Sequence, residues 1–162
     1  MRGAEGAVGR DAARLHYAWL VLGAATLVVF ASLGLARFGY TMVLPAMQAG
    51  LGLDNAGAGG LATANLVGYL GLSVVGGAVA ARCGPRGVIC AGLALAGLAM
   101  LLTASATGFA DAAAWRALTG VGSGASNVPV MGLLAAWFAR RRRGLAAGVA
   151  VTGSSFALIL LG

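Results

Sequence analysis

Charge is scarce in this sequence. Of its 162 residues only 9% are charged, lysine is absent, and there are one histidine and four acidic residues. Soluble globular domains carry about 25% charged residues, so this composition excludes that class. The sequence has instead 60% hydrophobic residues and a mean hydropathy of +0.92. These values indicate an integral membrane protein.

Residue types that carry enzyme chemistry are few and scattered. The acids all lie outside the apolar runs, and no nucleophile, base and orienting group occur together. Their positions are Glu5, Asp11, Asp54 and Asp111. The two cysteines, Cys83 and Cys90, lack the spacing of a metal site. We therefore predict that the chain is not an enzyme and uses no metal or cofactor.

Glycine is abundant but has no collagen-like period. The 28 glycines are spread among Leu, Val and Ala, a composition typical of closely packed membrane helices. Two pairs, Gly120 with Gly124 and Gly144 with Gly148, have the small-xxx-small spacing of a helix-packing face. We predict that both pairs pack against neighbouring helices.

Long uncharged stretches separate the charged residues. They cover residues 15–36, 55–81, 87–110, 117–139 and 144–162. Each is about long enough to cross the hydrocarbon core as a helix, the only open structure whose backbone groups are satisfied in lipid. We predict an all-α integral membrane fold. Its transmembrane helices are expected at about 17–44, 57–80, 87–106, 112–138 and 144–162, after a tail of residues 1–16.

The arginines predict the orientation in the membrane. Basic residues occur in the tail, at 81–86 and at 139–143, whereas the other two connections have none. By the positive-inside rule, the tail and both basic loops are cytoplasmic in a multi-pass protein of the cell (inner) membrane. This also accounts for the net charge of +7 without a nucleic-acid partner. Tyr17 and Tyr40, about 34 Å apart along a helix, fit aromatic anchors at the two interfaces.

Several motifs carry a family resemblance. "GAVAARCGPR", at 77–86, resembles the cytoplasmic loop signature G-x-L-A-D-R-x-G-R-R of the major facilitator superfamily. The matching positions are Gly77, Arg82, Gly84 and Arg86. Ala81 stands where that family usually has an aspartate of a charge latch between its two halves. The loop of this chain therefore lacks the acidic partner of that latch.

Other stretches extend the resemblance over almost the whole chain. "WRALTGVGSGA", at 115–125, resembles the fourth-helix signature R-x-x-x-G-x-G. "RFGYTMVLPAMQAGLGL", at 37–53, and "LATANLVGYLG", at 61–71, are similar to the first two helices of the YbfB/YjiJ-type branch.

The resemblance implies twelve helices in two six-helix halves around one central site. The five predicted helices would form most of the N-terminal half, so we expect an incomplete transporter that needs a C-terminal portion. The implied function is secondary active transport of a small solute by alternating access. The alternatives are a non-transporting membrane protein that packs against a partner, and a truncated inactive gene product.

Arg37 and Arg116 are the charges that fall within the outer parts of predicted helices. Intramembrane arginines usually face a cavity, and in this superfamily helices one and four both contribute to the central one. On that interpretation they attract an anionic solute, with Asn65, Tyr69 and Asn127 as hydrogen-bonding candidates. The alternative is that both arginines extend to the outer interface, near Tyr40 and Trp115.

Overall fold

The computed structural model of the chain describes residues 17–161. The predicted cytoplasmic tail of residues 1–16 lies outside this range. Every regular element within it is helical. The chain is α-helical over 17–29, and the elements that follow are η1 (Phe30–Phe38), α2 (Gly39–Leu51), α3 (Asn55–Cys83), α4 (Pro85–Thr103), α5 (Phe109–Trp137), η2 (Arg140–Arg142) and α6 (Arg143–Leu161).

The first helix is longer than the predicted 17–44. It runs without a break from Tyr17 to Leu51, and Pro45 lies inside α2. Membrane helices tolerate such a proline because neighbouring groups satisfy the freed carbonyl. The helix ends at Gly52, whose φ of +62° is left-handed and therefore favours glycine.

The middle of this first helix is a π-helix. In η1 the backbone bonds are wider than in an α-helix, as the bond from the Gly39 N–H to the Gly34 carbonyl shows. π-helical turns are rare and occur frequently at functional sites. Arg37 lies in the last turn of η1.

The two basic loops are much shorter than predicted. The sequence predicts a loop over 81–86, but α3 continues to Cys83 and α4 begins at Pro85. Gly84 alone makes the turn, with φ +90°, and Pro85 opens α4 where its missing N–H costs no hydrogen bond. In 139–143 the arginines form the 3-10 helix η2 and the start of α6.

Four helices of the described range are long and apolar enough to cross a membrane. They are Tyr17–Leu51, Asn55–Cys83, Pro85–Thr103 and Arg140–Leu161. The predicted fourth span, which is α5, is 29 residues long but does not qualify by hydropathy. Its glycines and buried polar side chains lower its hydropathy. Such residues are tolerated in α5 because it packs mainly against other helices.

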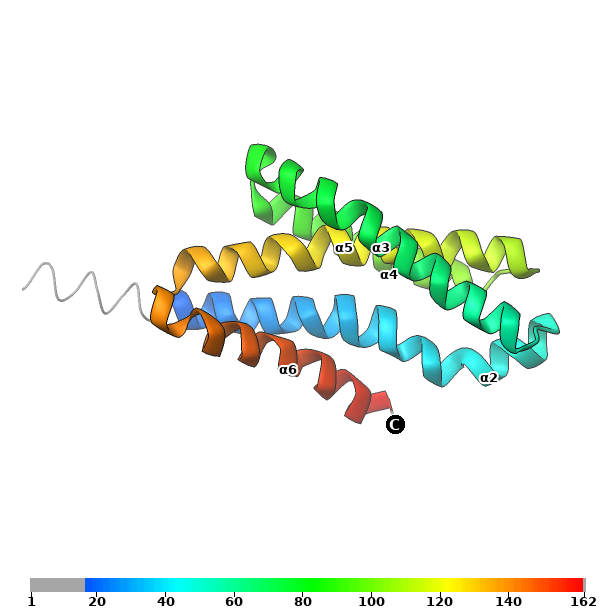
Figure 1. The fold of residues 1–162 in the computed structure, drawn as a ribbon. Helices are drawn as coiled ribbons and strands as arrows, with labels where there is room; N and C mark the ends of the chain where they lie inside the picture. Colours follow the sequence, from blue (N-terminus) through cyan, green and yellow to red (C-terminus); the bar gives the residue numbers. More distant parts are fainter. Residues whose placement is uncertain (1–16, 162) are drawn as a thin grey trace, which may run out of the picture.

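Helix α5 lies at the centre of the bundle. It packs against α3, α4 and η1, and in Figure 1 it runs through the middle of the molecule with α3 crossing it. A Cβ atom at Gly120 would collide with the backbone carbonyl oxygen of Asn65 and lie 2.8 Å from the Tyr69 nitrogen. At Gly124 it would lie 2.5 Å from the Tyr69 oxygen. Glycine therefore allows α3 and α5 to touch through their backbones.

Helix α6 packs against η1 through a different face from the one predicted. Gly144 and Gly148 are exposed, and a Cβ on either would meet nothing within 4 Å among the described residues. Within the described residues this pair contacts no neighbouring helix, so its packing role stays a prediction. The buried residues of α6 are Ala146, Ala150, Gly153, Ser154 and Ala157. Residues two apart on a helix lie about 200° apart around its axis, so Gly144 and Gly148 face away from this contact.

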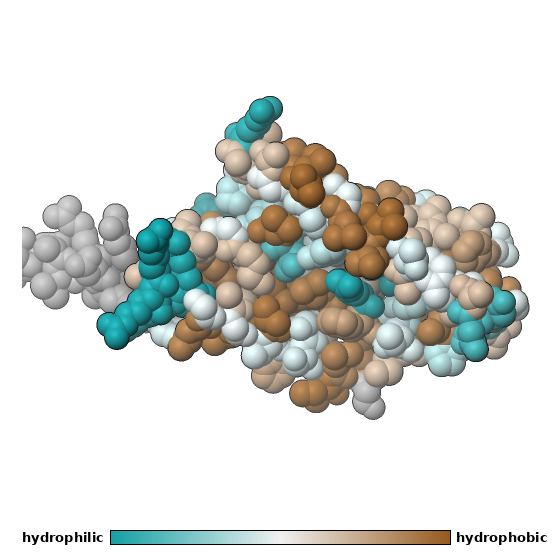
Figure 2. Space-filling view, in the orientation of Figure 1, coloured by the Kyte–Doolittle hydropathy of each residue, from teal (hydrophilic) through white to brown (hydrophobic). Residues whose placement is uncertain are grey.

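The ends of the bundle differ in charge. The start of the first helix, the α3–α4 turn and η2 lie at the same end of the molecule, toward the left of Figure 1. Arg82, Arg86 and the arginines of η2 are therefore gathered there. Figure 2 shows the most hydrophilic groups of this face mainly toward its ends, with apolar groups over the middle, as expected of a bundle that crosses a bilayer.

Candidate functional site

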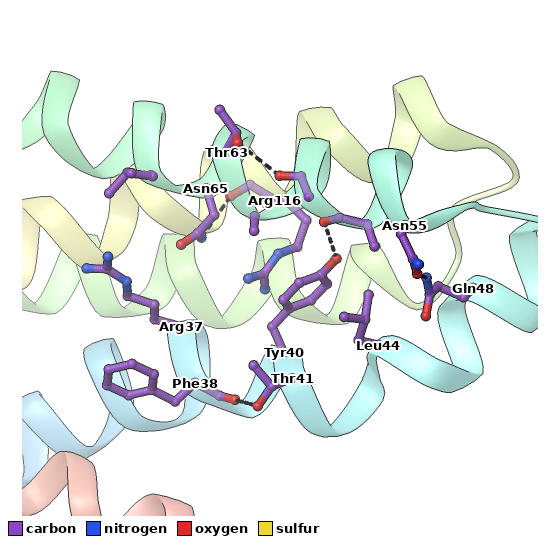
Figure 3. A pocket seen from close by; sticks show the side chains of 14 residues that line it. Arg37, Phe38, Tyr40, Thr41, Leu44, Gln48, Asn55, Thr63, Asn65 and Arg116 are labelled. Atoms are coloured by element: carbon purple, nitrogen blue, oxygen red, sulfur yellow. Dashed lines mark hydrogen bonds between the residues drawn. The ribbon is translucent and has the colours of Figure 1, made fainter.

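A cavity of about 550 Å³ lies between the first helix and α3. Its residues come from η1, α2 and α3, with Arg116 of α5 between them (Figure 3). The lining consists of Arg37, Phe38, Tyr40, Thr41, Leu44, Gln48, Asn55, Ala58, Gly59, Ala62, Thr63, Asn65, Leu66 and Arg116. Its size is within the usual range for a small-molecule site.

Arg116 is buried in the wall of this cavity. Its side chain is 4% exposed, and its guanidinium carbon lies 4.2 Å from the centre of the Tyr40 ring. Nη1 donates to the carbonyl oxygen of Ala36 at 3.2 Å, whereas Nε has no partner among the described residues. A guanidinium so placed does not extend to the membrane surface, so the interfacial interpretation fails for Arg116.

Tyr40 has a different position from the predicted interfacial anchor. It is 6% exposed, and its hydroxyl donates to the Ala58 carbonyl of α3 at 3.0 Å. The ring therefore connects the first helix to α3 and offers its π face to Arg116. The anchor prediction is wrong because a spacing along one helix does not determine which side of that helix faces lipid.

Arg37 lies on the same cavity beside a second tyrosine. Its guanidinium carbon is 5.5 Å from the centre of the Tyr69 ring. The Tyr69 hydroxyl accepts a hydrogen bond of 2.8 Å from Asn127 Nδ2, and Asn127 Oδ1 is buried without a partner among the described residues. Tyr69 and Asn127 are not part of the cavity lining. They lie next to it, because the Tyr69 ring contacts Arg37 and Asn127 bonds to Tyr69.

Asn65 holds α3 and α5 together next to the cavity. It is buried, and its Nδ2 donates to the backbone oxygen of Arg116 at 3.0 Å. The structure thus brings three predicted residues, Arg37, Asn65 and Arg116, to one cavity. Figure 3 shows Asn65 between the two arginines.

Sequence reasoning missed several lining residues. Those with polar side chains are Tyr40, Thr41, Gln48, Asn55 and Thr63. Gln48 and Asn55 lie outside the predicted spans of 17–44 and 57–80, so they read as parts of a loop. A prediction that the first helix continues past Leu44 would have indicated Gln48 as a site candidate, because it places Gln48 on the same helix as Arg37.

The residues of the loop signature lie elsewhere, at the basic end. Arg82 and Arg86 are exposed, and Arg86 Nη2 donates to the hydroxyl of Tyr17 at 3.0 Å. This contact connects the start of α4 to the first helix. A Cβ at Gly77 would lie 3.5 Å from a methyl of Val128 in α5, an ordinary contact.

A metal centre has no support in the described range. Within residues 17–161, no three or more His, Cys, Asp or Glu side chains come together as ligands. Cys83 and Cys90 are exposed free thiols.

Comparison with known proteins gives the family. A search of curated proteins found no match. The model of the family described as Major Facilitator Superfamily matches residues 24–162, a range that includes the five long helices except for the first turns of the first helix. Because the match extends over most of an all-helical, apolar chain, the protein belongs to the major facilitator superfamily of membrane transporters.

Proposed function

We propose that this chain forms part of a secondary active transporter that moves a small anionic solute by alternating access. The observation that carries the proposal is the convergence of Arg37 and Arg116 on one cavity. A buried cation is costly in a membrane unless it is paired. The carboxylates of the described residues are engaged elsewhere, since Asp54 accepts the Gly57 N–H and Asp111 accepts the Thr107 N–H. A solute anion is the natural partner.

The cavity would be one wall of a larger central site. All its lining residues come from the helices described here, and the family fold has a second half that faces the first across the site. We propose that further helices complete the site and supply the second set of contacts. Membership of the YbfB/YjiJ-type branch belongs to this proposal, and so does a cell inner-membrane location with a cytoplasmic N-terminus.

Movement between the two access states would involve the basic end. The single-residue turn at Gly84 and the bond from Arg86 to Tyr17 couple α3 and α4 to the first helix, which carries Arg37. Ala81 offers no charge for a latch, so the arginines of the turn would act through helix ends and lipid headgroups instead.

The test is uptake into proteoliposomes. The complete transporter is reconstituted at neutral pH, and uptake of radiolabelled gluconate and 6-hydroxyhexanoate is compared with leakage into protein-free vesicles. We expect the complete transporter to take up these anions. In Arg37→Gln and in Arg116→Gln the rate of uptake should fall by roughly 10-fold to 100-fold, the effect of losing a charge-assisted hydrogen bond. Arg140→Gln, at the basic end, should retain uptake and serves as the matched control.

Three outcomes would contradict the proposal. If both arginine variants insert into the membrane and transport at the normal rate, the arginines do not bind the solute. Uptake by the 162-residue chain alone would show that no further helices are needed. If neither the complete protein nor the 162-residue chain transports any of the anions although both insert stably, the alternative is favoured, which is a non-transporting protein that packs against a partner.

A further inference from the structure

The cavity has two chemically different ends. Arg37 and Arg116 lie toward one end, and Gln48 and Asn55 lie at the other, with Leu44 on the wall near the amides (Figure 3). A solute that fills the cavity lengthwise therefore meets a cationic region and an uncharged polar region.

The cationic end has unused hydrogen-bonding capacity. Arg116 donates through Nη1 to Ala36 and leaves Nε buried without a partner among the described residues. Arginine presents its donors in a planar fork that matches a carboxylate. The face of Tyr40 supports the guanidinium from one side. A carboxylate in the cavity would neutralise the charge of this guanidinium.

The amide end favours a hydroxyl group. Gln48 Nε2 donates to Asn55 Oδ1 at 3.2 Å, which leaves Gln48 Oε1 to accept a bond and Asn55 Nδ2 to donate one. A hydroxyl is able to donate to the first and accept from the second. Within the described residues no cation lines this end of the cavity, so a second carboxylate on the solute would find no charged partner there.

We infer, on the basis of the transport function proposed above, that the site selects a monocarboxylate that carries an uncharged hydroxyl at its far end. The carboxylate is bound by Arg37 and Arg116, and the hydroxyl by Gln48 and Asn55. Dicarboxylates are disfavoured because, within the described residues, the lining at the amide end includes no cation. Leu44 and Leu66 line the cavity between these groups and suit an aliphatic chain.

A matched series of solutes tests this selectivity. The complete transporter is purified in detergent, and its Kd for hexanoate, 6-hydroxyhexanoate and adipate is measured from the change in tryptophan fluorescence, since Trp115 adjoins Arg116. We expect 6-hydroxyhexanoate to bind about tenfold more tightly than hexanoate, the effect of two additional hydrogen bonds in a partly exposed site. Adipate should bind no more tightly than hexanoate. Adipate binding more tightly than 6-hydroxyhexanoate would overturn the inference.

Variants at the amide end separate this inference from the proposed function. Gln48→Met and Asn55→Ala should remove the preference for 6-hydroxyhexanoate, so that the ratio of its Kd to that of hexanoate approaches one. Thr152→Val, on the exposed side of α6, is the control and should keep the preference. If hexanoate binds but the hydroxyl adds nothing, the selectivity fails and anion transport stands. If hexylamine binds in place of the carboxylates, the anionic solute class itself is wrong.

Discussion

Gly120 has no room for a side chain. Its α-carbon faces the backbone of Asn65 and Tyr69, and the same α3 segment donates a hydrogen bond from Asn65 to the Arg116 carbonyl. Without a hydrophobic driving force between helices in lipid, such close backbone packing and interhelical hydrogen bonds hold a membrane bundle together. This glycine thus fixes the distance between the two helices that carry Asn65 and Arg116.

Replacement of this glycine should weaken the protein. Gly120→Ala places a methyl group against backbone atoms that cannot move aside, and we expect a loss of about 1–3 kcal/mol in the free energy of unfolding. The measurement is unfolding of the purified protein in mixed micelles, followed by circular dichroism.

Gly144→Ala provides the matched control for that substitution. Its position is open among the described residues, and alanine is the better helix former by up to about 1 kcal/mol. Its stability should therefore be unchanged or slightly higher. Equal losses in the two variants would show that the α3–α5 contact is not as close as described.

The elements are connected by turns with little freedom. Gly84 ends α3 and precedes α4 with φ +90° and ψ 139°, a backbone conformation that residues with a side chain rarely adopt. Pro85 follows and fixes the start of α4. The turn between the two helices therefore depends on one glycine.

Gly84→Ala should destabilise this turn. The strained backbone is expected to cost about 1–3 kcal/mol, and it should shift the bond between Arg86 and Tyr17 because α4 would change direction. The thermal midpoint in detergent measures the loss. Gly87→Ala, inside α4 with open space around it, should leave the midpoint unchanged. A normal midpoint for Gly84→Ala would mean that the turn adopts another conformation.

Apart from Arg37 and Arg116 in the cavity, the arginines of the described residues lie at one end of the molecule. Arg82, Arg86 and the η2 arginines lie there, together with Cys83, whereas Asp54 and Thr107 lie in the turns at the opposite end. If the positive-inside rule holds, these two sets lie on opposite sides of the membrane.

Thiol labelling tests this arrangement. In a Cys90→Ala background, Cys83 should react with a membrane-impermeant maleimide in inverted vesicles and not in intact cells. Asp54→Cys and Thr107→Cys, each without Cys83, should show the reverse. Two outer positions are used because Asp54 also caps α3. Labelling of Cys83 in intact cells would contradict the orientation.

The sequence by itself determined the class of fold and the approximate spans. Uncharged runs, the one-sided arginines and the motif at 77–86 are local patterns, and a bilayer requires each apolar run to form a helix. The same motifs indicated a resemblance to the major facilitator superfamily, and the match over residues 24–162 shows membership of it. The boundaries were less well predicted at Leu44, beyond which the first helix continues to Leu51, and at 81–86, where charge suggested a loop but the helices leave only Gly84 between them.

Only the tertiary structure decided which residues share the site. The residues that share the site depend on how far each helix is rotated about its axis. The hydropathy of an apolar helix does not determine this rotation. The π-helix η1 has more residues per turn than an α-helix. It therefore changes the direction in which the Arg37 side chain points from the first helix. The contact of Arg116 with Tyr40 joins residues far apart in the chain. The choice of Ala146 over Gly144 as the packing face of α6 likewise depends on the neighbouring helix, since both residues are small.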